Sequence, residues 1–150
     1  MTHEDFMLEA LKEARKGNAK GEVPVGAVIV LQGKIIARAH SLVRSKKDPT
    51  AHAEILAIRK AAVKNKYERL NGADMYVTLE PCAMCAGAMV LSRIERLYFG
   101  ASEPNTGAAG SVFNVVSDPH HNHRIKTFKA VLESESSELL RGFFKDKRKK

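Results

Sequence analysis

Apolar residues recur along this chain in helical and strand-like patterns. Within residues 2–20, Met7 and Leu11 stand four positions apart among polar residues, which predicts an amphipathic helix. Thr2 and Asp5 have the spacing of a capping box, the reciprocal pair of hydrogen bonds that begins many helices. The chain is therefore expected to open with a helix that has one apolar face.

Runs rich in β-branched and other apolar residues predict strands. The expected strands cover residues 23–31, 34–39, 75–79, 94–100 and 126–132. Gln32 and Gly33 separate the first two runs and predict a hairpin turn. In the first run, Pro24 predicts an edge position because it has no N–H, and Gly26 predicts a close backbone approach because it has no side chain.

Helical patterns lie between and after these strands. The expected helices are one capped by Thr50 that ends near Lys66, one after the strand at 75–79, a short one at 111–116 and a closing one at 133–145, with loops at 40–49 and 101–110. Strands with helices between them predict a layered α/β domain with a mixed sheet. A chain of 150 residues fits one domain with its own core.

Composition narrows the expected location. Two cysteines allow no disulfide framework, and no apolar run approaches the ~20 residues that a membrane-spanning helix needs. The charged N-terminus does not resemble a signal peptide. A cytoplasmic protein with no membrane partner is expected.

The chain carries 25 basic and 17 acidic side chains, a net charge of +8. Basic residues cluster in the tail at 145–150 and in the segment 44–47. Such runs are often only solvated surface. The second cluster lies just before the candidate chemistry, however, which favours a polyanion such as nucleic acid as the partner.

Both cysteines fall within residues 78–87. Pro81 stands where a helix is expected to begin, and Cys82 and Cys85 are three residues apart, so a helix would carry both sulfurs on one face of its first turn. The helix dipole favours thiolates at that end, and thiolate is the form that binds metal. The two sulfurs are expected to bind one ion.

His52 is the best candidate for a third ligand, because its expected position is in the first turn after Thr50. Three protein ligands leave a catalytic zinc ion its fourth position for water, and Glu54 would be the general acid/base. His-x-Glu with Pro-Cys-x-x-Cys is the signature of zinc nucleobase deaminases, which this chain resembles. Residues two apart on a helix point about 200° away from each other. The resemblance therefore implies a pocket at the N-terminal end of the helix.

Two other interpretations of the cysteine pair remain open. A redox-active pair is expected in a thioredoxin-like context, whereas here a proline precedes the first cysteine and a His-Ala-Glu helix precedes the strand. A closed structural zinc site needs a fourth ligand, which His120, His121 or His123 could supply. That arrangement would leave Glu54 without a role, so an open catalytic site is favoured.

Further segments narrow the resemblance. They are VPVGAV at 23–28, DPTAHAE at 48–54, YVTLEPC at 76–82, GAAGS at 107–111 and NHR at 122–124. In this order they resemble bacterial tRNA adenosine deaminases over nearly the whole chain. The resemblance implies a three-layer α/β/α sandwich with a five-stranded mixed sheet, cytidine deaminase-like, a homodimer and one Zn²⁺ per chain. It also implies hydrolytic deamination of the wobble adenosine in a tRNA anticodon stem-loop, by a zinc-bound hydroxide with Glu54 moving the protons.

The same resemblance implies residues that contact the substrate. Val25 and Pro81 would line the base pocket. Flanking nucleotides would meet Ser102, Glu103, Asn105 and Asn122, and the RNA would meet Phe144 and Arg148 on the last helix. Phe144 has an alternative place in the core, because an aromatic pair at the end of an amphipathic helix is commonly buried.

Ser41 departs from the family pattern. The family usually has His-Asn where this chain has His40-Ser41, and a hydroxyl lacks the separate donor and acceptor of an amide. Ser41 is expected to contact the target nucleotide, and an altered base preference is one outcome. The alternatives are a deaminase of the same fold that acts on cytosine or free guanine, and a catalytically silent, zinc-stabilised RNA-binding module.

Overall fold

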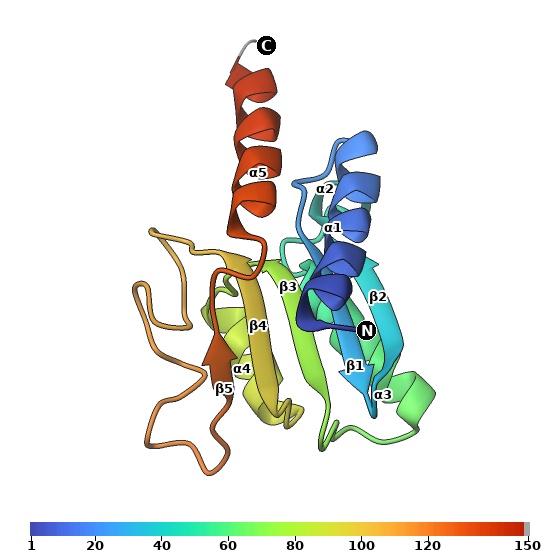
Figure 1. Cartoon of the computed structure of the whole chain (residues 1–150), viewed down its shortest axis with the longest axis vertical. Coiled ribbons are helices and arrows are strands. Elements are labelled where there is room, and N and C mark those ends of the chain that lie inside the picture. The colour runs from blue at the N-terminus through green and yellow to red at the C-terminus, as the bar shows by residue number, and fades with distance from the viewer. Residues whose placement is uncertain (149–150) are drawn as a thin grey trace.

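The computed structural model describes residues 1–148, with side chains through residue 146. Within this range five strands form one sheet (Figure 1). The strands are β1 (Gly26–Leu31), β2 (Lys34–His40), β3 (Asp74–Leu79), β4 (Arg96–Ala101) and β5 (Lys126–Phe128), in the order β2-β1-β3-β4-β5. β1 is antiparallel to β2 and β3, whereas β3, β4 and β5 run parallel, so the sheet is mixed as predicted.

Helices lie on both sides of the sheet (Figure 1). α1 (His3–Ala19) packs on one face, and α5 (Glu133–Arg148) begins against β4 on that side and extends past the end of the sheet. α3 (Ala53–Asn65) and α4 (Ala83–Leu91) cover the other face, and the short α2 (Val43–Lys46) connects β2 to α3. The predicted three-layer sandwich is confirmed. In the described part of the chain, no helix has both the length and the apolar character needed to cross a membrane.

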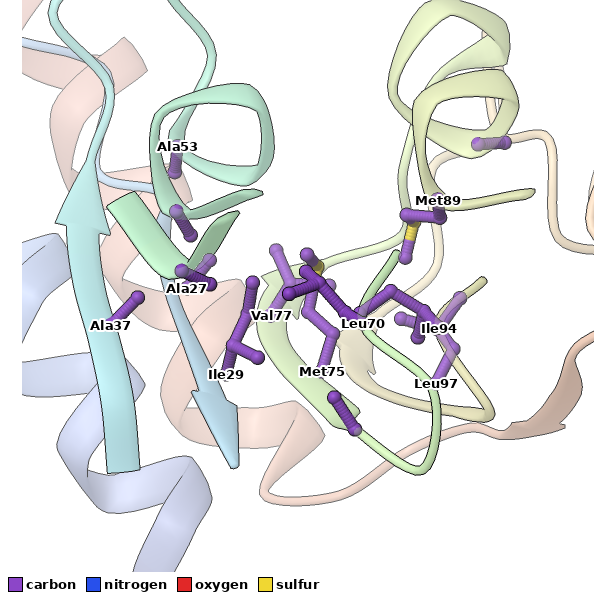
Figure 2. Packing of buried hydrophobic residues seen from close by; sticks show 14 of the residues in the cluster. Ala27, Ile29, Ala37, Ala53, Leu70, Met75, Val77, Met89, Ile94 and Leu97 are labelled. Atoms are coloured by element: carbon purple, nitrogen blue, oxygen red, sulfur yellow. The ribbon is translucent and has the colours of Figure 1, made fainter. Parts of the chain in front are cut away.

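Side chains of β1 alternate between two cores. Ala27 and Ile29 join the cluster beneath α3 and α4, where they lie near Val77 (Figure 2). Val28 and Val30 join the cluster beneath α1. Because both faces of the sheet are covered, this strand reads in the sequence as a continuous apolar run.

The close backbone approach predicted at Gly26 is confirmed. A Cβ at this position would lie 2.0 Å from the carbonyl oxygen of Ala10 on α1, so glycine lets the helix pack against β1. The predicted capping box of Thr2 and Asp5 is also present at the start of α1. The edge position predicted for Pro24 is wrong, because β1 begins after it and lies between β2 and β3.

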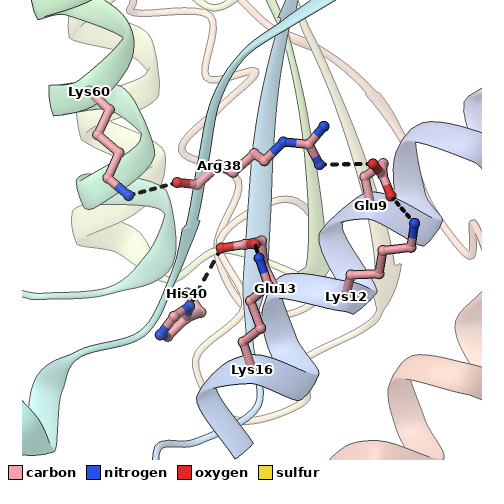
Figure 3. A network of polar contacts seen from close by, with 7 residues as sticks. All are labelled: Glu9, Lys12, Glu13, Lys16, Arg38, His40 and Lys60. Carbon is pink, nitrogen blue, oxygen red and sulfur yellow. Dashed lines mark hydrogen bonds and ion pairs between the residues drawn. The ribbon is translucent and has the colours of Figure 1, made fainter.

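Polar side chains tie the edge strand β2 to helices on both faces (Figure 3). Arg38 donates through Nη1 to Glu9 of α1 at 2.9 Å, and Lys60 of α3 donates to the Arg38 carbonyl at 2.8 Å. His40 Nδ1 lies 3.5 Å from Glu13 Oε1. These contacts cover part of an edge that would otherwise offer backbone groups to another strand.

The segment 111–116, predicted as a short helix, forms turns instead. The N–H groups of Ala109 and Ser111 donate to the carboxylate of Glu80 at 2.9 and 3.1 Å, and Ala109 forms an isolated β-bridge with Asn114. The helix prediction is wrong because a carboxylate distant in sequence binds the backbone donors at this point.

β5 and α2 also differ from the prediction. β5 ends at Phe128 rather than residue 132, because Ala130 and Leu132 have left-handed φ angles of 63° and 54°. α2 forms within the segment 40–49, which was predicted as a loop. Its first N–H groups donate to the buried Glu22, a tertiary cap that local sequence does not reveal.

Candidate active site

Three metal-ligating side chains meet at the N-terminal ends of α3 and α4. His52 Nδ1 lies 3.7 Å from Cys82 Sγ and 3.4 Å from Cys85 Sγ. All three ligand atoms lie within 4.8 Å of one another. The structure thus brings together the three ligands that the motif predicted.

His52 and Cys82 are the N-cap residues of the two helices. Both have extended backbones, with φ −71° and ψ 152° at His52 and φ −75° and ψ 176° at Cys82. The prediction that Thr50 caps α3 is wrong, because its hydroxyl donates to Asp48 at 2.7 Å and the helix begins three residues later. Pro81 likewise precedes α4 rather than opening it.

Glu54 lies in the first turn of α3 and lines the same cavity as His52. Because His52 lies outside the helix, the divergence of helical residues two apart does not separate the two side chains. Glu54 is only 4% exposed, and this burial raises the pKa of its carboxyl. A raised pKa makes a carboxyl a better proton acceptor than an exposed glutamate and lets it hold a proton at a higher pH.

The two thiols have opposite pKa shifts. Hydrogen bonds with Cys85 and His52 lower the pKa of Cys82 to about 3, which makes it a thiolate. The hydrogen bond with Cys82, together with burial, raises the pKa of Cys85. The hydrogen bond with Cys82 also raises the pKa of His52. These shifts arise because the three side chains lie close together, which is the arrangement that a shared cation needs.

The donor set fits zinc. Zn–N bonds of about 2.0–2.1 Å and Zn–S bonds of about 2.3 Å in a tetrahedron place nitrogen and sulfur ligands about 3.6 Å apart. The distances of 3.4 and 3.7 Å from His52 to the sulfurs lie on either side of that value. A divalent cation would also supply the charge that makes Cys85 a thiolate. Three protein ligands leave one position for water.

A cavity of about 290 Å³ opens beside these residues. His52, Glu54 and Cys82 are among its polar lining residues, and Val25 and Leu79 are among its apolar ones. A mainly apolar pocket with a few polar groups is typical of small-ligand sites. This cavity combines apolar walls with side chains that can donate and accept hydrogen bonds.

The predicted substrate-binding residues differ in their position relative to the cavity and in their exposure. Those that line the cavity are Val25, Ser41 and Glu103. Pro81 is buried beside the cavity without lining it. Ser102 and Asn105 lie on either side of Glu103 in the sequence and are exposed.

Asn122 and Phe144 are not among the described residues that line the cavity. The histidine after Asn122 lies 2.6 Å from the carbonyl of Ile94, just before β4, so this turn is at the opposite end of the sheet. Phe144 is exposed on α5, whereas Phe143 is buried. The side chain of Arg148 lies outside the part of the chain that the structure describes. RNA contact by these three residues stays a prediction.

Glu80 supports the cavity wall, a role that sequence reasoning missed. Its buried carboxylate accepts the N–H groups of Glu103, Ala109 and Ser111 at 3.0, 2.9 and 3.1 Å and the Ser111 hydroxyl. A Cβ on Gly107 would lie 2.5 Å from this carboxyl. Burial alone would raise the pKa of Glu80, but these hydrogen bonds lower it overall. The available signal was an acidic residue directly after an apolar strand.

Sequence reasoning also missed further cavity residues from loops and α2. They are Val23, Val43, Arg44 and Thr106. Val23 belongs to the VPVGAV segment and Arg44 to the basic cluster at 44–47, but neither pattern places a residue at the cavity, because that depends on how distant loops fold against one another.

Comparison with known proteins agrees with this site. Residues 1–101 match the family model for the cytidine and deoxycytidylate deaminase zinc-binding region. The chain is 52% identical over 145 residues to a tRNA-specific adenosine deaminase of Aquifex aeolicus (strain VF5), covering 97% of this chain and 95% of the relative. It is 48% identical over 151 residues to that of Bacillus subtilis (strain 168), covering 100% and 94%.

One solved structure is similar to this chain in both sequence and fold. It has a TM-score of 0.87 and 49% identity, and the match covers 91% of this chain and 99% of that one. It comes from a study of A-to-I editing by tRNA:A34 deaminases at the wobble position of transfer RNA. The family match includes His52, Glu54, Cys82 and Cys85. This chain therefore belongs to the cytidine and deoxycytidylate deaminase family, alongside the tRNA-specific adenosine deaminases.

Proposed function

We propose that this protein is a zinc-dependent hydrolase that converts the wobble adenosine of a tRNA anticodon loop to inosine. The observation that carries the proposal is the meeting of His52, Cys82 and Cys85 beside the buried Glu54 in one cavity. About half of the residues are identical to those of tRNA-specific adenosine deaminases over nearly the whole chain, which supports this substrate.

In this proposal His52, Cys82 and Cys85 hold one Zn²⁺ per chain. When bound, the ion lowers the pKa of a water molecule so that hydroxide is available near neutral pH. Glu54 accepts the proton released from that water and delivers protons to the ring nitrogen and the departing amine. Water supplies the new oxygen at C6 and the amine leaves, so adenosine and water become inosine and ammonia.

The target base must leave its stack to enter the cavity, which costs less in an anticodon loop than in a duplex. Val25 and Leu79 offer apolar contact to the ring. Ser41 offers one hydroxyl where the family usually has an amide. We expect this position to hold adenosine less firmly and to admit altered base preference, including cytosine.

The proposed RNA partner fits the charge near the cavity. Arg44, Lys46 and Lys47 are exposed on and directly after α2, which borders the cavity. Phe144 is exposed on α5, and with Arg148 it is proposed to extend the RNA contact. Because the proposed substrate is a tRNA, a cytoplasmic location is part of the same proposal.

A homodimer is also part of the proposal. Val63 on α3 and Leu91 on α4 are each 79% exposed, and Met84 on α4 is partly exposed. α3 and α4 are in contact on the same face of the sheet, so these side chains present apolar area to water. Exposed apolar side chains on one face of a protein are typical of an interface, and a second copy of this chain is the proposed partner.

The test is inosine formation in a transcribed anticodon stem-loop with a wobble adenosine. The zinc-loaded full chain should produce inosine, and Glu54→Ala at equal zinc content should not. A stem-loop with guanosine at the same position should be unchanged. Absence of inosine from a protein with one zinc per chain would overturn the proposed substrate.

A further inference from the structure

The lining of the cavity has an unbalanced charge for a nucleotide site. Glu54, Glu80 and Glu103 all line it. Apart from the candidate ligand His52, Arg44 is the only basic side chain among the described residues of the lining. A nucleotide carries a phosphate, which these carboxylates would repel.

Glu22 fixes the backbone of Arg44. The buried carboxylate of Glu22 accepts the Arg44 N–H at 3.0 Å and the Ser45 N–H at 2.7 Å, and it accepts the Ser45 hydroxyl as well. Burial alone would raise the pKa of Glu22, but these hydrogen bonds lower it overall, so it is a carboxylate at neutral pH. The position of Arg44 at the cavity is therefore set by the fold.

The guanidinium of Arg44 is held from two directions. Its Nη1 donates to the carbonyl of Gly21 at 3.3 Å, and its Cζ lies 5.2 Å from the ring centroid of Phe143 on α5. A stacked guanidinium uses its face and keeps its in-plane N–H donors. Of the five N–H donors, the bond to Gly21 accounts for one, and the side chain is exposed. The remaining donors are available to a ligand at the cavity mouth.

We propose that Arg44 binds a backbone phosphate of the nucleotide whose base enters the cavity. The inference rests on the proposed function and deepens it, because it names the group that selects a polynucleotide over a free base. Arginine matches phosphate with paired donors, and the contacts with Gly21 and Phe143 reduce the entropy lost on binding.

A purely structural role is the competing explanation, because Arg44 also links the loop before β1 to α5. The two roles predict different results. If Arg44 is only a structural link, its loss should lower thermal stability and weaken the binding of every RNA equally. If Arg44 binds a phosphate, its loss should remove the contact with that one phosphate and change the salt dependence of binding.

The first experiment measures binding, so it does not depend on turnover. The zinc-loaded Glu54→Gln protein and the same protein with Arg44→Gln are titrated with an anticodon stem-loop over a range of salt concentrations. Arg44→Gln should raise the Kd about tenfold and reduce the slope of log Kd against log salt by about 0.7 to 1. The matched control is Arg69→Gln, an exposed arginine ahead of the amino end of β3, which should change neither value.

The second experiment identifies the phosphate. Stem-loops with one neutral methylphosphonate at each loop position are compared on both proteins. At one loop position, the methylphosphonate should weaken binding to the parent protein but have no effect on binding to Arg44→Gln. Equal effects on both proteins at every position, or a lowered Tm with unchanged salt slope, would overturn the role of Arg44. A parent that does not bind the stem-loop would overturn the proposed function as well, so the two failures differ.

Discussion

His52 and Glu54 line the same cavity although only one residue separates them, because His52 is the extended N-cap of α3 and Glu54 lies in its first turn. Deeper in a helix this spacing would send the side chains apart. The His-x-Glu motif thus depends on where the helix begins. In the proposed function, this arrangement lets His52 bind the metal while Glu54 transfers protons in the same cavity.

Glu54→Gln should leave a folded protein that binds zinc and RNA but turns over very slowly. The amide keeps the shape of the side chain and cannot accept the proton, so kcat should fall by about 10²–10⁴-fold or more. Single-turnover assays of inosine, with zinc content and stem-loop Kd measured in parallel, check this. A variant that keeps more than a tenth of the activity would remove Glu54 from the proton-transfer step.

Cys85→Ser should lose metal and stability together. The hydroxyl is a poor replacement for a thiolate, so the measured zinc content should fall from one ion per chain to well below that value. Tm should fall with it, because a ligand that binds only the folded chain stabilises it. Chelation of the unmodified protein should reproduce both losses. Added zinc should restore zinc content and Tm in the unmodified protein but not in Cys85→Ser. Full zinc occupancy in Cys85→Ser would contradict the ligand set.

Glu80→Gln should lower the free energy of unfolding by about 2–3 kcal/mol at pH 7, because a buried carboxylate loses charge-assisted hydrogen bonds. The folded-state pKa of Glu80 is below its ordinary value of 4.5. Its contribution is therefore complete above about pH 4.5 and is lost as pH falls through the folded-state pKa.

Urea unfolding of both proteins between pH 7 and pH 3 measures this effect. The difference between them should shrink as the pH falls. Glu68→Gln, an exposed carboxylate with no such contacts in the described residues, should match the parent at every pH. A difference that stays constant down to pH 3 would show that the charge of Glu80 is not what holds the loop.

Ser41→Asn should raise kcat/KM for the adenosine stem-loop, because the amide offers a separate donor and acceptor to the target nucleotide. Any activity on a cytidine stem-loop should fall relative to that on adenosine. The two stem-loops are compared in one competition assay. Unchanged kinetics on both would show that this position does not tune base preference.

Leu91→Glu should shift the protein towards monomer, because it places a charge at a highly exposed apolar position on the face proposed to bind a second copy. Sedimentation at several concentrations measures the change. Leu8→Glu is the control, since Leu8 is also exposed but lies on α1 on the opposite face of the sheet. A parent that is already monomeric would contradict the proposed homodimer.

Local sequence predicted most of the fold because most elements have a local signal. The capping box of Thr2 and Asp5 marked α1, and apolar runs marked the strands. The errors occur where distant residues decide the backbone. Glu22 accepts the first N–H groups of α2, and Glu80 accepts N–H groups at the start of the segment that was predicted as a helix.

In the candidate site too, residues with a local sequence signal were predictable and residues placed by distant contacts were not. His52, Cys82 and Cys85 were predictable because metal ligation needs fixed residue types at fixed spacings. Arg44 was visible only as part of a basic cluster, because its place at the cavity depends on Glu22 and Phe143, far away in the sequence.

The proposed reaction is tested most directly by nucleoside analysis of anticodon stem-loops after incubation with the zinc-loaded full chain, with free guanine and cytidine assayed in parallel. Inosine is expected at the wobble position alone, and it should be lost with Glu54→Gln and after zinc removal. Deamination of free guanine or cytidine without any inosine in the stem-loop, by a protein with one zinc per chain, would contradict the proposed reaction.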